Sequence, residues 1–141
     1  MYYIKDQEQA EEIIAKNREE YKDARHVVYA YTLKSSGRFT DDKEPQGTAG
    51  KPIYSLLEKE NVINTLIIVI RYFGGIKLGA GGLVRAYSNS IVEALKLTNK
   101  IELTLGYLIE FEFSYDQTKI IDYILNDKNI IKKIYDNNTI Y

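Results

Sequence analysis

The part of the sequence that is most informative about the fold is the stretch RYFGGIKLGAGGLVRAY, residues 71–87. This stretch contains five of the nine glycines in the chain. The apolar run VINTLIIVIRYF, residues 62–73, leads into it and has the pattern of a strand covered on both faces. The segment LVRAYSNSIVEALKL, residues 83–97, follows with helical spacing of its apolar residues. The sequence therefore predicts a strand, a glycine-rich loop and a helix in succession.

The composition of this loop favours an anion. Glycine lets a bound group approach the backbone because no Cβ is in the way, and a helix that starts here adds unpaired N–H groups. From Asn61 through Val92 the only charged side chains are three cations. We predict an anion or nucleic-acid site at Arg71, Gly74, Gly75, Lys77, Gly79, Gly81, Gly82 and Arg85, with Thr48 and Lys51 from a second glycine-bearing turn. The alternative is that the glycines only allow the strand-to-helix corner and close packing.

The best-known phosphate loops do not match. GTAGKP contains a Gly-Lys pair, but Pro52 stands where a P-loop has the Ser or Thr that holds magnesium. Gly79 and Gly81 begin a G-x-G, but Val84 stands where the third glycine of the dinucleotide fingerprint belongs. The loop is therefore neither of these two nucleotide sites.

A second motif, DDKEPQGTAGKP at residues 41–52, concentrates carboxylates at Asp41, Asp42 and Glu44 before a turn. These three could ligate magnesium, which prefers oxygen. We favour a structural role, in which they cap the turn and pair with Arg71 or Lys77. Upstream, His26 is the only histidine, and we expect it to make a structural hydrogen bond at the start of a strand.

Composition restricts the function classes further. The 141 residues predict one domain, with room for a small or incomplete second one. Net charge is −1, so anion binding has to come from a local patch. The chain has no cysteine, which excludes disulfides and thiolate chemistry, and a single histidine, which excludes a two-histidine metal site. The opening MYYIKDQEQAEEII is neither a signal peptide nor a membrane span, so we expect a cytoplasmic protein that does not enter membranes.

Patterns elsewhere predict the remaining elements. We expect a helix at 7–21, a strand at 26–34, a loop at 35–52 and a short helix at 52–60. After residue 100 we expect a half-exposed strand at 108–113, a helix near 116–127 and a strand at 130–135. These last elements cannot close a core of their own. We therefore predict one domain at 1–103 and the beginning of another, incomplete, at 104–141.

The two motifs together resemble the YigZ/IMPACT family, with ARHVVYAY at 24–31 matching its histidine-centred strand. The resemblance runs from about Tyr3 to Leu97 and implies a chain truncated at both ends. It implies an α+β fold, a two-layer α/β sandwich of the ribosomal protein S5 domain 2-like type with a left-handed β-α-β crossover. It also implies that residues 104–141 begin a ferredoxin-like domain. The family pattern has glycine where this chain has Lys43, so we expect a different or strained turn there.

The resemblance implies a translation-associated protein whose partners are RNA, the ribosome or a translation factor. We favour such a non-enzymatic binding protein and expect no cofactor and no metal. One alternative is an enzyme acting on a phosphorylated small molecule or nucleotide, since GHMP kinases share this fold type. The other is a protein-interaction module. The sequence indicates no catalytic residues and no oligomeric state.

Overall fold

A computed structural model describes residues 1–135 and 139–140 of the chain. It divides into two compact units, Met1–Lys100 and Ile101–Tyr141, which we call the N-terminal and the C-terminal unit. Each is described by itself below. Within the described residues, none of the helices combines the length and the apolar character needed to cross a membrane.

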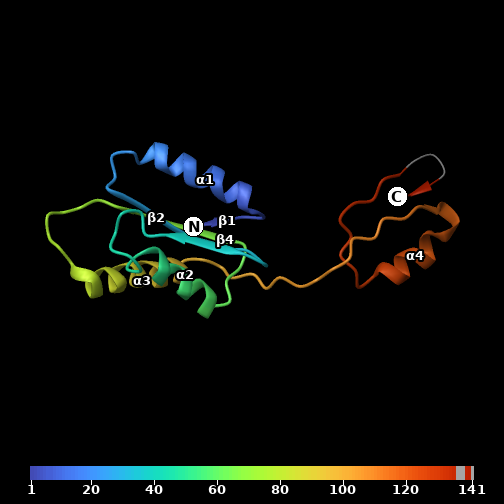
Figure 1. The fold of residues 1–141 in the computed structure, drawn as a ribbon. Helices are drawn as coiled ribbons and strands as arrows, with labels where there is room; N and C mark the ends of the chain where they lie inside the picture. The colour runs from blue at the N-terminus through green and yellow to red at the C-terminus, as the bar shows by residue number, and fades with distance from the viewer. Residues whose placement is uncertain (136–138, 141) are drawn as a thin grey trace. The chain divides into compact units, whose positions relative to one another are not determined.

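The N-terminal unit is built on one antiparallel sheet (Figure 1). Its strands are β1 (Tyr2–Tyr3), β2 (His26–Thr32), β3 (Gly37–Thr40) and β4 (Thr65–Arg71). They lie in the order β1-β4-β2-β3, and each neighbouring pair is antiparallel. Because β3 and β4 both run antiparallel to β2, they are parallel to each other. The helix that connects them, α2 (Gly50–Lys59), completes a β-α-β unit whose left-handed crossover stays a prediction.

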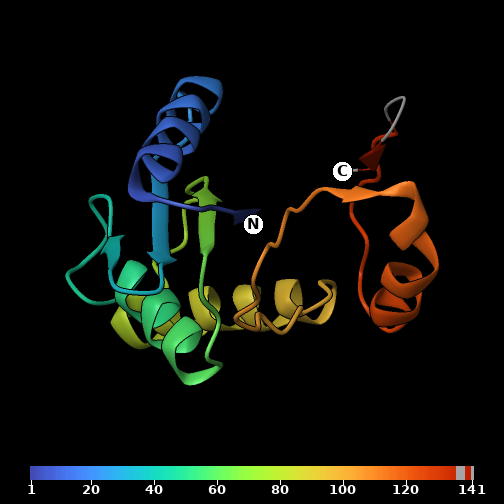
Figure 2. The ribbon, with the colours of Figure 1, turned by 90° about the vertical axis from the view of Figure 1, so that its right-hand side faces the viewer.

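Helices cover both faces of this sheet. Figure 1 shows α1 (Gln7–Glu20) on one side and α2 with α3 (Gly79–Lys96) on the other, and Figure 2 shows α2 and α3 next to each other. Alternate residues of β2 point to opposite faces, so Val28 packs against α2 and α3 while Tyr29 packs against α1. The unit therefore has three layers, and the predicted two-layer sandwich is wrong. The physical reason is that the apolar stripe of α1, with Ala10 and Ile14, needs a face of its own.

Each sheet face carries its own apolar cluster. The first joins the sheet to α2 and α3 and comprises Val28, Ala30, Ala49, Ile53, Leu57, Ile67, Leu83, Tyr87 and Ile91. The second joins the sheet to α1 and comprises Ile4, Ala10, Ile14, Tyr29, Tyr31 and Leu66. The strand predicted at 62–73 supplies residues to both clusters through Leu66 and Ile67, as a run covered on both faces should.

The ends of the helices follow local signals. The carboxylate of Asp6 accepts the backbone N–H of Gln9 at 2.8 Å and caps α1. α2 ends with Asn61 in the left-handed region (φ 51°), and the N–H of Val62 returns to the carbonyl of Leu57 at 2.9 Å. α3 begins at Gly79, four residues earlier than predicted, so three of the five glycines lie in its first turn.

Two further differences concern short segments. The loop predicted at 35–52 contains β3, whose GRFT sequence has little strand character of its own and is held by β2. In the C-terminal unit, β5 (Phe113–Ser114) pairs with β6 (Thr139–Ile140), and between them lie the 3₁₀ turn η1 (Tyr115–Gln117) and α4 (Thr118–Leu125).

The strands predicted at 108–113 and 130–135 are wrong over most of their length. Residues 101–112 and 130–134 have no regular secondary structure. Among residues 101–135 the only buried side chain is that of Phe113. Strand alternation without a covering layer gives no burial, so these segments lack what would hold them extended.

Candidate anion-binding site

The candidate site lies at the end of the sheet where β4 finishes and β2 begins. The antiparallel register places Arg71, the last residue of β4, opposite His26, the first residue of β2. The acidic turn at 41–44 follows β3 on the other side of β2. Thus three segments that are separated in the sequence meet at one end of the sheet.

The side chain of Asp41 forms hydrogen bonds with backbone groups of the chain itself. Its carboxylate accepts N–H groups from Gly47 at 2.7 Å, Ala49 at 3.0 Å and Gly50 at 2.8 Å. Two of these amides belong to the start of α2, so the anion at this helix N-terminus is Asp41 itself. This arrangement is the structural role that the sequence favours for Asp41.

Asp42 and Lys43 form a strained turn. Both have positive φ values, 40° and 68°, and lysine therefore stands where the backbone favours glycine. The carbonyl of Asp42 accepts Nδ1 of His26 at 2.8 Å, which puts the ring proton on that nitrogen. The carboxylate of Asp42 accepts the N–H of Val27. His26 thus makes a hydrogen bond at the start of β2, where the sequence predicts one.

Glu44 is the centre of a buried polar cluster. Its side chain is only 4% exposed, and its Oε1 accepts Nη1 of Arg71 at 2.6 Å and the hydroxyl of Tyr87 at 2.9 Å. Nε2 of His26 lies 3.7 Å from the same oxygen. Burial and the neighbouring Glu44 carboxylate raise the pKa of Tyr87. Arg71 is thus paired with the acidic turn, which is the alternative to ligand contact that the sequence left open.

Thr48 is not available to a ligand. Its hydroxyl donates to the carbonyl of Pro45 at 2.6 Å and its N–H to the same carbonyl at 3.1 Å. Next to it, a Cβ on Gly50 would lie 2.2 Å from the carbonyl oxygen of Thr40, so packing requires that glycine. Lys51 lies exposed in the first turn of α2. The second glycine-bearing turn is therefore built for the chain's own packing.

The glycine segment, defined here as residues 72–82, differs from this turn, because its glycines are not all explained by the chain's own packing. Gly75 and Gly79 have positive φ values of 87° and 70°, so their backbone conformation requires glycine. Gly74 and Gly81 do not have positive φ, and a Cβ on either would meet no atom within 4 Å. Neither backbone strain nor packing within the chain explains these two glycines. Only Gly82 is close-packed, against Leu78 at 3.0 Å.

The start of α3 is likewise open. No side chain among the described residues caps it, in contrast to the start of α2. No backbone hydrogen bond outside helices and strands involves residues 73–78 in the described part of the chain. Lys77 and Arg85 are exposed, and neither forms an ion pair with a described residue. Two unpaired cations and an uncapped helix N-terminus thus adjoin the two unexplained glycines.

The structure adds residues that the sequence did not indicate. The guanidinium of Arg25 lies 5.3 Å from the ring centroid of Phe73, and that of Arg71 lies 5.8 Å from it. The hydroxyl of Tyr72 donates to Asp23 at 3.0 Å. Both aromatic rings are well exposed, Tyr72 by 55% and Phe73 by 41%. No local signal marks Arg25, because only the pairing of β2 with β4 brings the α1–β2 turn beside the glycine segment.

The carboxylates do not form a metal site. Asp41, Asp42 and Glu44 each bind different protein groups. Across residues 1–135 and 139–140, no group of three or more possible metal-binding side chains occurs. The magnesium alternative for the acidic turn therefore has no geometric support.

Comparisons with known proteins agree with this architecture. The model of the family described as Impact N-terminal domain matches residues 1–95. The IMPACT family member YvyE of Bacillus subtilis is 35% identical over 133 residues, which cover 92% of this chain and 61% of that protein. The IMPACT family member YigZ of Escherichia coli is 37% identical over 137 residues, covering 91% and 66%. A crystal structure of a hypothetical protein is 31% identical, with a TM-score of 0.64, over 98% of this chain and 70% of that one.

Proposed function

The chain belongs to the Impact N-terminal domain family, and from this premise we propose that it binds RNA phosphates on the ribosome or in translation complexes through the glycine segment. The observation that carries the proposal is the contrast between the two helix starts. At α2 the amides are occupied by the Asp41 carboxylate, whereas no side chain in the described part of the chain caps α3. A helix N-terminus without an internal anion attracts an external one.

The surroundings of the glycine segment support RNA over a simple inorganic anion. Lys77 and Arg85 supply two unpaired charges, and the glycine segment begins with the exposed aromatic rings of Tyr72 and Phe73. Unstacked bases pack on such rings while cations contact the phosphates. With two free cations we expect weak, salt-sensitive binding with little sequence preference. Regulation of translation would follow from that binding.

The finer description of the fold is proposed on the same premise. We infer an S5 domain 2-like N-terminal domain at 1–103 to which α1 adds a third layer, because β3, α2 and β4 form a β-α-β unit with parallel strands. The C-terminal unit would belong to a ferredoxin-like domain starting near residue 104. An experimental structure that shows a right-handed crossover would reject this assignment.

The proposal is tested by fluorescence anisotropy at low salt, with labelled single-stranded RNA, hairpin RNA and ribosomal subunits. The double variant Lys77→Ala, Arg85→Ala should weaken binding by roughly tenfold to thirtyfold, since each ion pair near 4 Å contributes about 1 kcal/mol in water. The matched control is Lys16→Ala, Lys59→Ala, which removes the same charge from exposed positions on α1 and α2. Equal losses in both variants would indicate non-specific attraction and reject the site.

A competition experiment with a nucleotide distinguishes RNA binding from the enzyme alternative. ATP with magnesium, added as a competitor, should displace RNA only at concentrations where inorganic triphosphate does the same. Selective displacement by ATP would instead indicate a nucleotide site. Binding to ribosomal proteins that persists after nuclease treatment would point to the protein-interaction alternative.

A further inference from the structure

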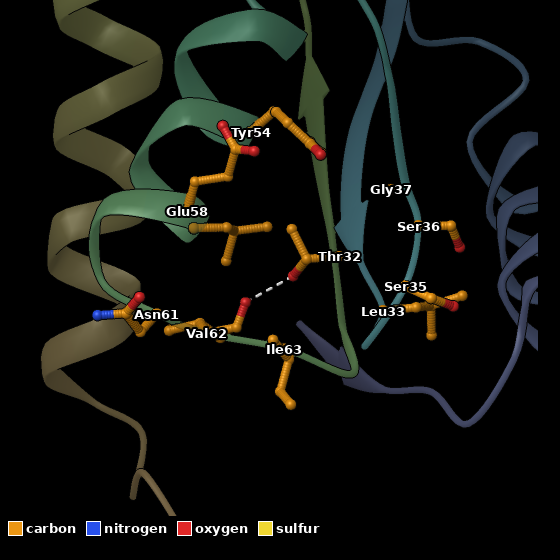
Figure 3. Close-up of a pocket in the computed structure, with 11 residues that line it drawn as sticks. Thr32, Leu33, Ser35, Ser36, Gly37, Tyr54, Glu58, Asn61, Val62 and Ile63 are labelled. Atoms are coloured by element: carbon orange, nitrogen blue, oxygen red, sulfur yellow. Dashed lines mark hydrogen bonds between the residues drawn. The ribbon is translucent and has the colours of Figure 1, made fainter.

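A concave site lies at the opposite end of the sheet from the glycine segment. Figure 3 shows this cavity of about 420 Å³ between the β2–β3 turn, the C-terminal end of α2 and the start of the segment that leads to β4. That volume is within the range of small-molecule sites. It is lined by Thr32, Leu33, Ser35, Ser36, Gly37, Tyr54, Leu57, Glu58, Asn61, Val62 and Ile63.

Local backbone rules shape this cavity. The left-handed residue Asn61 stops α2 and turns the chain, and the carbonyl of Val62 then accepts the hydroxyl of Thr32 at 2.6 Å (Figure 3). On the other side, the N–H of Leu33 donates to the carbonyl of Ser36 at 2.7 Å and closes the β2–β3 turn. Two hydrogen-bonded turns thus form two of the walls.

The third wall comes from α2. A Cβ on Gly37 would lie 2.6 Å from the ring of Tyr54, so this ring covers the start of β3 because glycine is there. Burial and the Glu58 carboxylate raise the pKa of Tyr54. The Tyr54 hydroxyl lies one helical turn from this carboxylate and is placed to donate to it.

The charge on the residues that line the cavity favours a ligand of opposite charge. Glu58 is the only charged residue among the eleven that line it. It stands in the last turn of α2, where the negative end of the helix dipole adds to its own charge. The neighbouring Glu60 is already paired with Lys100 at 2.7 Å and does not line the cavity. The Glu58 carboxylate forms no ion pair with a described residue, and at a helix C-terminus such a carboxylate favours a cation.

The remaining surface selects an aliphatic ligand. Leu33, Leu57, Val62 and Ile63 supply apolar walls, while Ser35, Ser36 and Asn61 offer polar groups at the rim. An alkyl chain can displace water from such walls while its ammonium group meets the carboxylate. We propose that this cavity is a binding site for a small aliphatic primary amine, with Glu58 as its counter-ion. This site is separate from the proposed RNA site.

The test is a titration of the ¹⁵N-labelled chain with n-butylammonium, followed by two-dimensional NMR. The amides of residues 33–37 and 61–63 should shift and saturate in the millimolar range. Butanol and butyrate serve as neutral and anionic probes of the same length, and both should bind at least about threefold more weakly. Glu58→Gln should reduce the affinity for n-butylammonium by about three- to fivefold.

Glu60→Gln is the matched control, because it removes the same charge two residues further along the chain, at the C-cap of α2, from a residue that does not line the cavity. It should leave the affinity unchanged. Both positions are exposed, and the dispersion of the free spectra shows directly that each variant is folded. Equal binding of the three probes, equal effects of the two variants, or shifts confined to other residues would each overturn the proposal.

Discussion

Replacing Asp41 by alanine is the most demanding test of how the acidic turn works. Its carboxylate accepts three backbone N–H groups within 3.0 Å, and one of them belongs to the fully buried Ala49. Hydrogen bonds to a charged acceptor contribute about 1.5–3 kcal/mol each, and loss of a helix cap alone costs about 0.5–2 kcal/mol. Since the three bonds share one carboxylate, they are not additive. We expect Asp41→Ala to lower the free energy of unfolding by about 3 kcal/mol.

The assay is thermal or urea unfolding monitored by circular dichroism. For a unit of about 100 residues, a loss of about 3 kcal/mol corresponds to a fall in Tm of about 12–24 °C. Asp41→Asn is the control, because its carbonyl oxygen can still accept from Ala49 and Gly50 while its amide faces Gly47. It should lose about half as much. If Asp41→Ala changed the free energy of unfolding by less than about 0.5 kcal/mol, the carboxylate would not be the structural anion of α2, and a ligand-binding role would have to be reconsidered.

Four further substitutions test the surroundings of the site. Glu44→Gln should cost about 2 kcal/mol in urea unfolding because Arg71 loses its carboxylate partner; no loss would mean that the buried pair is not stabilising. Gly50→Ala should destabilise by more than about 3 kcal/mol through its clash, whereas Gly74→Ala should cost less than about 1 kcal/mol by the same assay. Lys43→Gly should stabilise by about 1 kcal/mol, because the left-handed backbone there is strained in lysine; a loss of stability would contradict that reading of the turn.

The sequence predicts the central elements because their patterns are strong and local. The apolar run around Leu66 and Ile67 and the charged helix before His26 both appear where expected. β3 was not predicted because its short segment is extended only through its pairing with β2. The three layers were not predicted because no local pattern says which sheet face a helix will cover.

The same distinction applies to the site. Clusters of one residue type, such as the glycines and the carboxylates of the acidic turn, are visible in the sequence. Their partners are not. That Glu44 receives Arg71 and Tyr87, and that Arg25 stacks on Phe73, depends on strand register and on helix packing. The open space at Gly74 and Gly81 likewise exists only in three dimensions.

Lys77 and Arg85 are the residues through which the glycine segment is proposed to contact phosphates. The direct measurement is the dependence of RNA affinity on salt concentration for the unmodified chain and for the Lys77→Ala, Arg85→Ala variant. Two contacts to single-stranded RNA predict a slope of about −1.4 in log K against log salt, and the variant should approach zero. A slope that stays the same when both cations are removed would contradict the account.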